Sequence, residues 1–289
     1  MDSVKNIKEK TVSNFLKNNY LYMIWFVLYF MLTWLMLGAT LISFFIALGG
    51  YAISLTIAFS PAGEQILRLT NNVRELATKK EREYIMPIYE DVYTEAMNIF
   101  PNLRKDIEIC IMDTLYINAC ALGKRTVAVT RGAIESLSED EIKGFIAHEL
   151  GHIANGDTKA LLLTTVGNGI FTIFIVIAQL IVNVLNGMFA KNGTAGLIVF
   201  IGKLMFQLTL WYLVNLGEII LSINSRKNEY AADEFAYEIG QGDNLASALY
   251  ILQDISTSNN RKLMAKLKAS HPHIAKRIGR LETMIERED

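Results

Sequence analysis

The sequence is poor in the residues that define several classes of protein. Among 289 residues there are only two cysteines and four prolines, so a disulfide framework and a proline-rich extended chain are both excluded. Basic and acidic residues nearly balance, 28 against 29, so no net positive charge is present to bind nucleic acid. Charged residues make up only 20% and hydrophobic residues 52%, which excludes a disordered chain. This composition is typical of a membrane protein with a sizeable polar part.

Two regions of the chain carry long apolar runs. Residues 20–59 contain no charged side chain across 40 positions, whereas one helix needs about 20 residues to cross a bilayer. A second apolar region covers residues 160–223. We therefore predict four transmembrane helices, two in each region: Tyr20–Leu37, Leu41–Phe59, Ala160–Leu185 and Leu197–Ile223.

Lysine and arginine are distributed unevenly between these regions. The first 19 residues hold four, residues 60–159 hold twelve and residues 224–289 hold ten, which leaves only two for residues 160–223. Cytoplasmic loops carry the excess of these residues, so we expect a multi-pass protein of the cytoplasmic membrane with both termini in the cytosol. Because the first apolar run is far longer than the core of a signal peptide, we expect it to remain as an anchor.

The resulting domain order alternates between cytosol and membrane. We predict a cytosolic tail (1–19), a transmembrane hairpin (20–59), a first cytosolic part (60–159), a second hairpin (160–223) and a second cytosolic part (224–289). The two cytosolic parts together are long enough to form one domain with its own core.

The polar part predicts helices around a small sheet. Charged and apolar residues recur at helical spacing through Pro61–Phe100, and the tail after Arg226 is helical again in short pieces. A helix is also expected after Ser138, which begins a capping box. Between them, three short β-branched runs indicate a small antiparallel sheet: Ile107–Met112, Tyr116–Leu122 and Thr126–Thr130. The predicted fold class is α+β and mainly helical.

The helix expected after Ser138 carries the segment His148-Glu149-Leu150-Gly151-His152. Two histidines four residues apart share one helical face, so both imidazoles can bind one metal ion. Glu149 lies beside them, in position to act as general base on a metal-activated water. This H-E-x-x-H pattern predicts a zincin-like cytosolic domain with one Zn²⁺ per chain, in which His148 and His152 are ligands and Glu149 is catalytic.

A hydrolytic zinc site needs a third protein ligand and one open position. Our candidate is Glu229, which follows the fourth predicted span by about six residues, while His152 precedes the third by about eight. A transmembrane hairpin returns the chain to the side that it left, so these segments are expected to be close together. Asp233 lies one helical turn beyond Glu229 and can orient a ligand histidine through its free N–H. The competing interpretation is a solvated acidic face that also includes Glu234 and Glu238.

Taken in order, these motifs resemble the HtpX-type membrane metalloproteases of peptidase group M48, which are related to the CAAX-processing proteases. The resemblance rests on four segments: Asn118–Thr130, Ala147–Asp157, Ser225–Asp233 and Ser270–Leu281. It implies the same zinc ligands and general base as the spacing does. It further implies that Arg226 and Asp233 support the ligands and that His271 lies on the substrate side of the site.

The resemblance also implies a function, namely a zinc-dependent endopeptidase at the cytosolic face of the membrane. Its partners would be the lipid bilayer and misfolded or damaged membrane proteins, hydrolysed in protein quality control and stress response, with no role for nucleic acid. The sequence does not indicate an oligomeric state. Where HtpX sequences tend to have Asn-Ala-Phe-Ala-Thr-Gly, this chain has Asn118-Ala119-Cys120-Ala121-Leu122-Gly123, so their specificity does not carry over.

The alternative function is a multi-span divalent-metal transporter that uses the H-E-x-x-H motif as its metal site. In a transporter the motif would lie within a spanning helix, because the site must lie on the permeation path. Here Asn155-Gly156-Asp157 follow the motif before any apolar run, which disfavours this alternative.

Two ionisable residues, Lys203 and Glu218, lie within the fourth predicted span. They are 15 residues apart, roughly 22 Å along a helix, so they cannot pair with each other. Each can extend its charged end to the nearer interface, or both can line a polar groove between spans. The sequence leaves both interpretations open.

Overall fold

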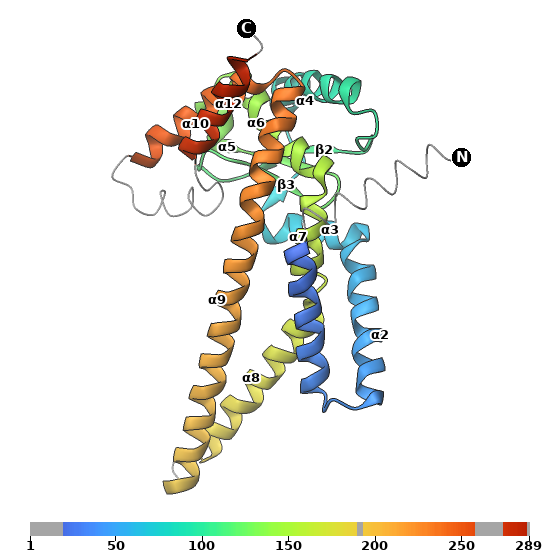
Figure 1. The fold of residues 1–289 in the computed structure, drawn as a ribbon, viewed down its shortest axis with the longest axis vertical. Coiled ribbons are helices and arrows are strands. Elements are labelled where there is room, and N and C mark those ends of the chain that lie inside the picture. Colours follow the sequence, from blue (N-terminus) through green and yellow to red (C-terminus); the bar gives the residue numbers. More distant parts are fainter. Residues whose placement is uncertain (1–19, 190–192, 258–273, 288–289) are drawn as a thin grey trace, which may run out of the picture. The chain divides into compact units, whose positions relative to one another are not determined.

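The structure is a computed structural model that describes residues 20–189, 193–257 and 274–287 (Figure 1). The chain divides into two compact units, and both are discontinuous in sequence. Of the described residues, unit 1 contains those of Ala62–Lys159 and those from Ser225 onward, and unit 2 contains those up to Pro61 and those of Ala160–Asn224. Residues from before and after the second apolar region therefore fold together in unit 1.

Unit 2 consists of helices rich in apolar residues. A first helix, Tyr20–Met36, is joined to α2 (Leu41–Ala58) through Gly38 and Ala39, both with positive φ. Thr40 caps α2 by accepting a hydrogen bond from the backbone N–H of Ser43. The later helices are α7 (Asp157–Thr165), which begins in unit 1, α8 (Gly169–Phe189) and α9 (Gly193–Glu238), which ends in unit 1.

Two described helical segments are long and apolar enough to cross a membrane. These are Leu41–Ala58 and Phe171–Met188, while Tyr20–Met36 and Gly193–Thr209 are apolar but shorter. The second and third predicted spans therefore each have a helix that meets the requirement by length and composition, and the other two stay predictions. The third begins at Phe171 and not at Ala160 as predicted, because the helix is interrupted between Thr165, the end of α7, and Gly169, the start of α8. Lys203 is half-buried on α9, and the side chain of Glu218 lies outside the described residues.

Unit 1 is built on a four-stranded sheet that is mixed rather than antiparallel. Its strand order is β1-β2-β4-β3, in which β2 and β4 pair in parallel and the other pairs are antiparallel. The strands are β1 (Val73–Arg74), β2 (Glu108–Met112), β3 (Ala119–Leu122) and β4 (Thr126–Thr130).

The predicted antiparallel sheet is wrong because β4, and not β3, lies beside β2. Every residue of β4 is buried, as expected of a strand covered on both faces, so this strand takes an inner position. The chain turns at Gly123, which has a positive φ of 63°, and β3 is left at the edge of the sheet. The helical reading of Pro61–Phe100 holds for α3 (Pro61–Thr70) and α4 (Lys79–Ile99) but misses β1 between them.

Helix α6 (Glu139–Asn155) is the central helix of unit 1. It packs against α4, α10 (Gly242–Thr257) and β3, and Figure 1 shows α12 (Ile274–Ile285) with α10 near it. The predicted capping box is confirmed, because the Ser138 hydroxyl accepts from Glu141 N and the Glu141 carboxylate accepts from Ser138 N. The helix ends at Gly156, whose φ of 80° stops it in the left-handed conformation.

Candidate metal centre

The two histidines of the H-E-x-x-H motif lie on the inner face of α6. His148 and Glu149 are buried and His152 is partly buried. Because positions four apart share one side of a helix, ligand atoms of these three residues all lie within 4.8 Å of one another. Their side chains therefore form one cluster that can hold a metal ion.

Glu229 joins this cluster from α9, 77 residues beyond His152 in the sequence. Its Oε2 lies 3.6 Å from His148 Nε2 and its Oε1 lies 3.7 Å from His152 Nε2. In a tetrahedral zinc site with bonds of about 2.0–2.1 Å, neighbouring ligand atoms are about 3.3–3.4 Å apart. The observed separations are close to that value, so these three residues fit a zinc ion without a large rearrangement.

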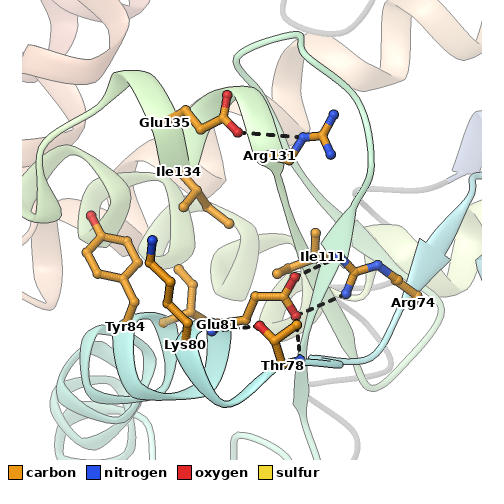
Figure 2. A pocket seen from close by; sticks show the side chains of 10 residues that line it. Arg74, Thr78, Lys80, Glu81, Tyr84, Ile111, Arg131, Ile134 and Glu135 are labelled. Carbon is orange, nitrogen blue, oxygen red and sulfur yellow. Dashed lines mark hydrogen bonds and ion pairs between the residues drawn. The ribbon is translucent and has the colours of Figure 1, made fainter.

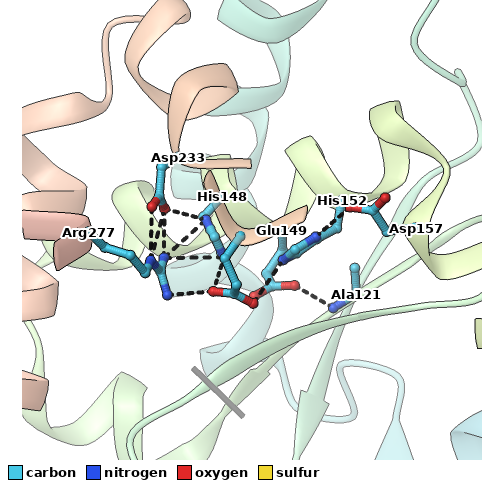
Figure 3. A network of polar contacts seen from close by, with 8 residues as sticks. Ala121, His148, Glu149, His152, Asp157, Asp233 and Arg277 are labelled. Carbon is cyan, nitrogen blue, oxygen red and sulfur yellow. Dashed lines mark hydrogen bonds and ion pairs between the residues drawn. The ribbon is translucent and has the colours of Figure 1, made fainter. Parts of the chain in front are cut away.

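Each histidine is held by its own carboxylate through Nδ1. His148 Nδ1 lies 3.0 Å from Asp233 Oδ1, and His152 Nδ1 lies 3.0 Å from Asp157 Oδ2. Figure 3 draws both contacts. An ionised carboxylate only accepts hydrogen bonds, so Nδ1 of each ring is the donor to its carboxylate, and Nε2 is the ring atom on the side of Glu229. Proteins orient metal-binding histidines in this way.

The charges around the cluster also fit a divalent cation. Among the described residues, four buried carboxylates, Glu149, Asp157, Glu229 and Asp233, surround it together with the buried guanidinium of Arg277. With neutral imidazoles, four negative charges and one positive charge leave an excess of three negative charges out of water. A buried excess of this size is costly unless a cation offsets it.

The same negative charge changes the acidity of both histidines. Burial disfavours the charged imidazole of His148, and so does Arg277, but the hydrogen bonds with Asp233 and Glu229 outweigh them and raise its pKa. For His152, burial is likewise outweighed by the hydrogen bond with Asp157 and by the charges of Glu149 and Glu229, which raise its pKa to about 9. The site thus attracts positive charge at both imidazoles.

Arg277 of α12 ties two of the carboxylates together. Its Nη1 donates to Glu229 Oε2 at 2.6 Å, its Nη2 donates to Asp233 Oδ1 at 2.7 Å, and its Nε donates to Asp233 Oδ2 at 2.9 Å. The side chain of Arg277 is 1% exposed, and its Nη2 lies 3.3–3.4 Å from the ring nitrogens of His148. The guanidinium therefore fixes where Glu229 and Asp233 lie.

Arg277 and Asp157 are not among the site residues that the sequence predicts. The resemblance implies a supporting role for Arg226 and a substrate-side position for His271, but the side chain of Arg226 and the whole of His271 lie outside the described residues. Arg277 lies on the buried face of α12 with Ile278 and Leu281. In the sequence, a basic residue at a position where the amphipathic pattern calls for an apolar one could have indicated that Arg277 is buried. For Asp157, the sequence indicated only that it directly follows Gly156, the glycine that ends the helix.

Glu149 connects the cluster to the edge of the sheet. Its Oε2 accepts a hydrogen bond of 2.6 Å from the backbone N–H of Ala121 on β3 (Figure 3). A small cavity of about 10 Å³ adjoins His148 and Glu149 and is walled by Leu245, Leu249 and Leu252 of α10, among others. The candidate general base thus lies between the metal-binding atoms and an edge strand.

The two thiols do not offer a competing chemistry. Burial raises the pKa of Cys110 to about 11 and raises that of Cys120 further. A thiol with a raised pKa is protonated at neutral pH, and the thiolate is the form that binds metals and attacks carbonyl groups.

A larger cavity of about 490 Å³ lies elsewhere in unit 1 (Figure 2). Apolar side chains such as Ile85, Ile111 and Ile134 line it. Its acidic groups are already paired, Glu81 with Arg74 and Glu135 with Arg131, and no histidine or cysteine lines it. By size this cavity would be the candidate functional site, but the chemistry of its side chains makes the cluster on α6 the better candidate.

Comparison with known proteins identifies the family of the chain. The sequence model described as peptidase family M48 matches residues 80–285. "Protease HtpX homolog" of Fusobacterium nucleatum is 32% identical over 212 residues, which cover 63% of this chain and 64% of that protein. "Protease HtpX" of Shewanella sp. strain ANA-3 and that of Shewanella oneidensis are each 30% identical over 202 residues, covering 61% of this chain and 67% of theirs.

The match therefore spans about two thirds of the length of these relatives. The family match, in contrast, extends over well more than half of the present chain and contains His148, His152, Glu229 and Arg277. The chain belongs to peptidase family M48, and the resemblance to HtpX-type members that its motifs indicated is confirmed.

Proposed function

We propose that this chain is a zinc-dependent endopeptidase of the cytoplasmic membrane that hydrolyses peptide bonds of misfolded or damaged membrane proteins at the cytosolic face. The observation that carries the proposal is the convergence of His148 Nε2 and His152 Nε2 on the Glu229 carboxylate. The names of the relatives, which are proteases of the HtpX type, agree with the proposal.

His148, His152 and Glu229 would hold one zinc ion per chain. When bound, zinc lowers the pKa of a coordinated water from 15.7 to about 7 and polarises a carbonyl group. Asp233 and Asp157 keep both imidazoles in the tautomer that presents Nε2. In this proposal Asp233 and Arg277 act by positioning the ligands, and Arg226 and His271 keep the supporting and substrate-side roles that the resemblance implies.

Glu149 would act as the general base and then as the general acid. Its carboxylate is held by Ala121 N–H at 2.6 Å beside the metal-binding atoms, so it can take a proton from the attacking water. It can return that proton to the leaving amine once the peptide bond breaks. Both transfers use one carboxylate in one position.

The substrate would bind as an extended strand beside β3. This strand lies at the edge of the sheet, and an edge strand can pair with an added peptide through its backbone groups. Such binding recognises the backbone of any unfolded segment, which suits a protease that removes damaged proteins.

The membrane topology is part of the same proposal. Four spans in two hairpins, with the tail 1–19 and the segments 60–159 and 224–289 in the cytosol, agree with the distribution of lysine and arginine. The metal-transporter alternative is not favoured, because His148 and His152 lie on α6 of unit 1. Among the described helices, α6 is not one of the two that could span a membrane.

The decisive experiment compares the full-length chain with its Glu149→Gln variant in detergent. Bound zinc is measured by mass spectrometry and cleavage by the release of fragments from an unfolded protein. We expect the variant to bind as much zinc as wild type and to cleave nothing. Glu139→Gln, the same change at an exposed position of the same helix, should keep both properties.

Two results would overturn the proposal. One is cleavage by the Glu149→Gln variant at the wild-type rate, which would remove the proposed base. The other is wild-type protein that cleaves equally well after a chelator has removed all bound metal. Zinc uptake into liposomes that is unaffected by Glu149→Gln would favour the transporter instead.

A further inference from the structure

Helix α3 buries its two charged residues and exposes two of its three large apolar residues, whereas Leu67 is buried. Glu64 and Arg68, one helical turn apart, are 3% and 9% exposed, whereas Ile66 and Leu69 are 41% and 67% exposed. A surface helix of a soluble domain shows the opposite arrangement, with its apolar stripe facing the core. The outward face of α3 therefore fits an apolar medium better than water.

The inward charges attach α3 firmly to the sheet. Glu64 Oε1 accepts hydrogen bonds from the Thr126 hydroxyl at 2.7 Å and from Arg125 N at 2.9 Å. Arg68 Nε donates to the Thr126 hydroxyl at 2.8 Å, and its Nη2 donates to Glu108 at 2.6 Å. Glu108 and Thr126 are the first residues of β2 and β4, so α3 is fixed to the beginning of two inner strands.

The short connection between α2 and α3 indicates that this apolar medium is the membrane. Helix α2 ends at Ala58 and α3 begins at Pro61, so only Phe59 and Ser60 separate them. Because α2 is one of the two segments able to cross a membrane, α3 begins where the chain leaves the hydrocarbon. A helix at that position with an outward apolar face matches an interfacial helix.

One lysine lies beside α3, and a second lies within electrostatic range of the first. Lys124 lies in the β3–β4 turn next to Gly123, at which a Cβ would be only 3.0 Å from the Glu64 side chain. Burial lowers the pKa of Lys124, and the charges of Arg104 and Lys159 lower it further. Lys159 is itself the last residue before the chain enters unit 2 for the second time.

This positive group has a natural partner at a membrane. Anionic headgroups attract lysine and arginine near the surface. Lys124 lies near α3, which follows the predicted span of α2, and Lys159 directly precedes the second apolar region. The apolar face and the basic group thus fit two layers of the same bilayer, its acyl chains and its headgroups.

We propose that unit 1 rests on the bilayer through α3, with Ile66 and Leu69 inserted among the lipid chains and Lys124 and Lys159 facing anionic headgroups. Because Glu64 and Arg68 fix α3 to the sheet, the contact sets the height of the α6 cluster above the membrane. This inference rests on the membrane location proposed above and is independent of the zinc chemistry.

The test places a fluorescent label at a single cysteine of the full-length chain in lipid nanodiscs. Native Cys110 and Cys120 are replaced by alanine, and Leu69→Cys is labelled with a polarity-sensitive dye. The matched control is Leu115→Cys, which is 70% exposed against 67% for Leu69 but follows the opposite end of β2. Quenching by lipids that carry a spin label on the acyl chain is then measured.

We expect quenching at position 69 to exceed that at position 115 by about threefold or more, since an interfacial helix buries its apolar face about 5–10 Å into the boundary between headgroups and acyl chains. Equal quenching at the two positions would overturn the insertion of α3. Bound zinc, measured on each labelled protein, checks independently that the fold is intact. A loss of protease activity alone would not affect this result.

The headgroup contact is tested in the same nanodiscs. Replacing phosphatidylcholine by a mixture with phosphatidylglycerol should increase quenching at position 69, and the double change Lys124→Gln and Lys159→Gln should abolish that increase. The control Lys79→Gln and Lys80→Gln, at exposed positions at the start of α4, should leave it intact. Quenching that does not respond to the anionic lipid would overturn the proposed role of the lysines.

Discussion

Replacing Asp157 tests how much of the metal affinity comes from the hydrogen bond that orients His152. The Asp157 Oδ2 lies 3.0 Å from His152 Nδ1. Its other oxygen is buried and has no hydrogen-bond partner among the described residues. Asp157 is therefore a cleaner probe than Asp233, which also binds Arg277 and whose loss would disturb the fold.

The size of the effect follows from what each substitution removes. Loss of an outer partner of a ligand histidine typically costs 10–100-fold in metal affinity, or about 1.4–2.7 kcal/mol. Asp157→Asn keeps an oxygen acceptor but loses the charge, so we expect the lower end, about tenfold. Asp157→Ala removes the acceptor as well and frees the imidazole to rotate, so we expect about 100-fold.

The assay is competition for zinc between the purified full-length chain and a chelator of known affinity. Thermal unfolding of each variant in the presence of zinc checks that the fold survives. Asp140→Asn, the same change in the exposed first turn of α6, should bind zinc like wild type. If Asp157→Ala binds zinc within about twofold of wild type, which corresponds to less than about 0.5 kcal/mol, the orienting role of Asp157 is refuted.

Three further predictions concern the stability of unit 1. Arg277→Met removes the guanidinium that binds the buried carboxylates of Glu229 and Asp233, and it should lower the free energy of unfolding by about 3–5 kcal/mol in chemical unfolding. Arg280→Met, at an exposed position of the same helix, should change the free energy of unfolding little. Equal effects of the two substitutions would contradict this account. Gly144→Ala places a Cβ 2.4 Å from Leu245 N and should lower the unfolding temperature sharply, whereas Gly279→Ala, with open space around it, should raise or maintain it. Hydrogen bonds from Arg74 and from Thr78 N lower the pKa of Glu81 from 4.5 to about 2, so its stabilisation is full above pH 4.5 and is lost as the pH falls toward 2. The difference in unfolding temperature between wild type and Glu81→Gln should therefore shrink below pH 4.5, and a constant difference would show that the ion pair does not contribute.

The part of the site that lies on one helix could be predicted from the sequence, including the arrangement of its side chains. His148, Glu149 and His152 lie within one helical turn, and Ser138 and Glu141 define where that helix begins. Such features depend on hydrogen bonds and side-chain spacing within a few residues. Any fold that contains this helix presents the two imidazoles together.

The sheet shows where the same reasoning fails. Three apolar runs with turns between them were expected to form an antiparallel sheet, yet β4 lies between β2 and β3 and pairs with β2 in parallel. Pairing order depends on which strand gains most from being covered on both faces, and that depends on residues far away in the chain. The two-residue strand β1 was missed because it is too short to show a periodicity.

The sequence by itself determined the apolar segments, the motif helix and the chemical identity of the candidate metal-binding groups on that helix, because each depends on residues that are neighbours along the chain. The tertiary structure alone decided that Glu229 faces both imidazoles, that Asp157 and Asp233 hold one histidine each and that Arg277 binds the carboxylates between them. Arg277 and His148 are 129 residues apart, and contacts over such a separation form only when the core of unit 1 folds. They are set by packing in three dimensions, which no local pattern records.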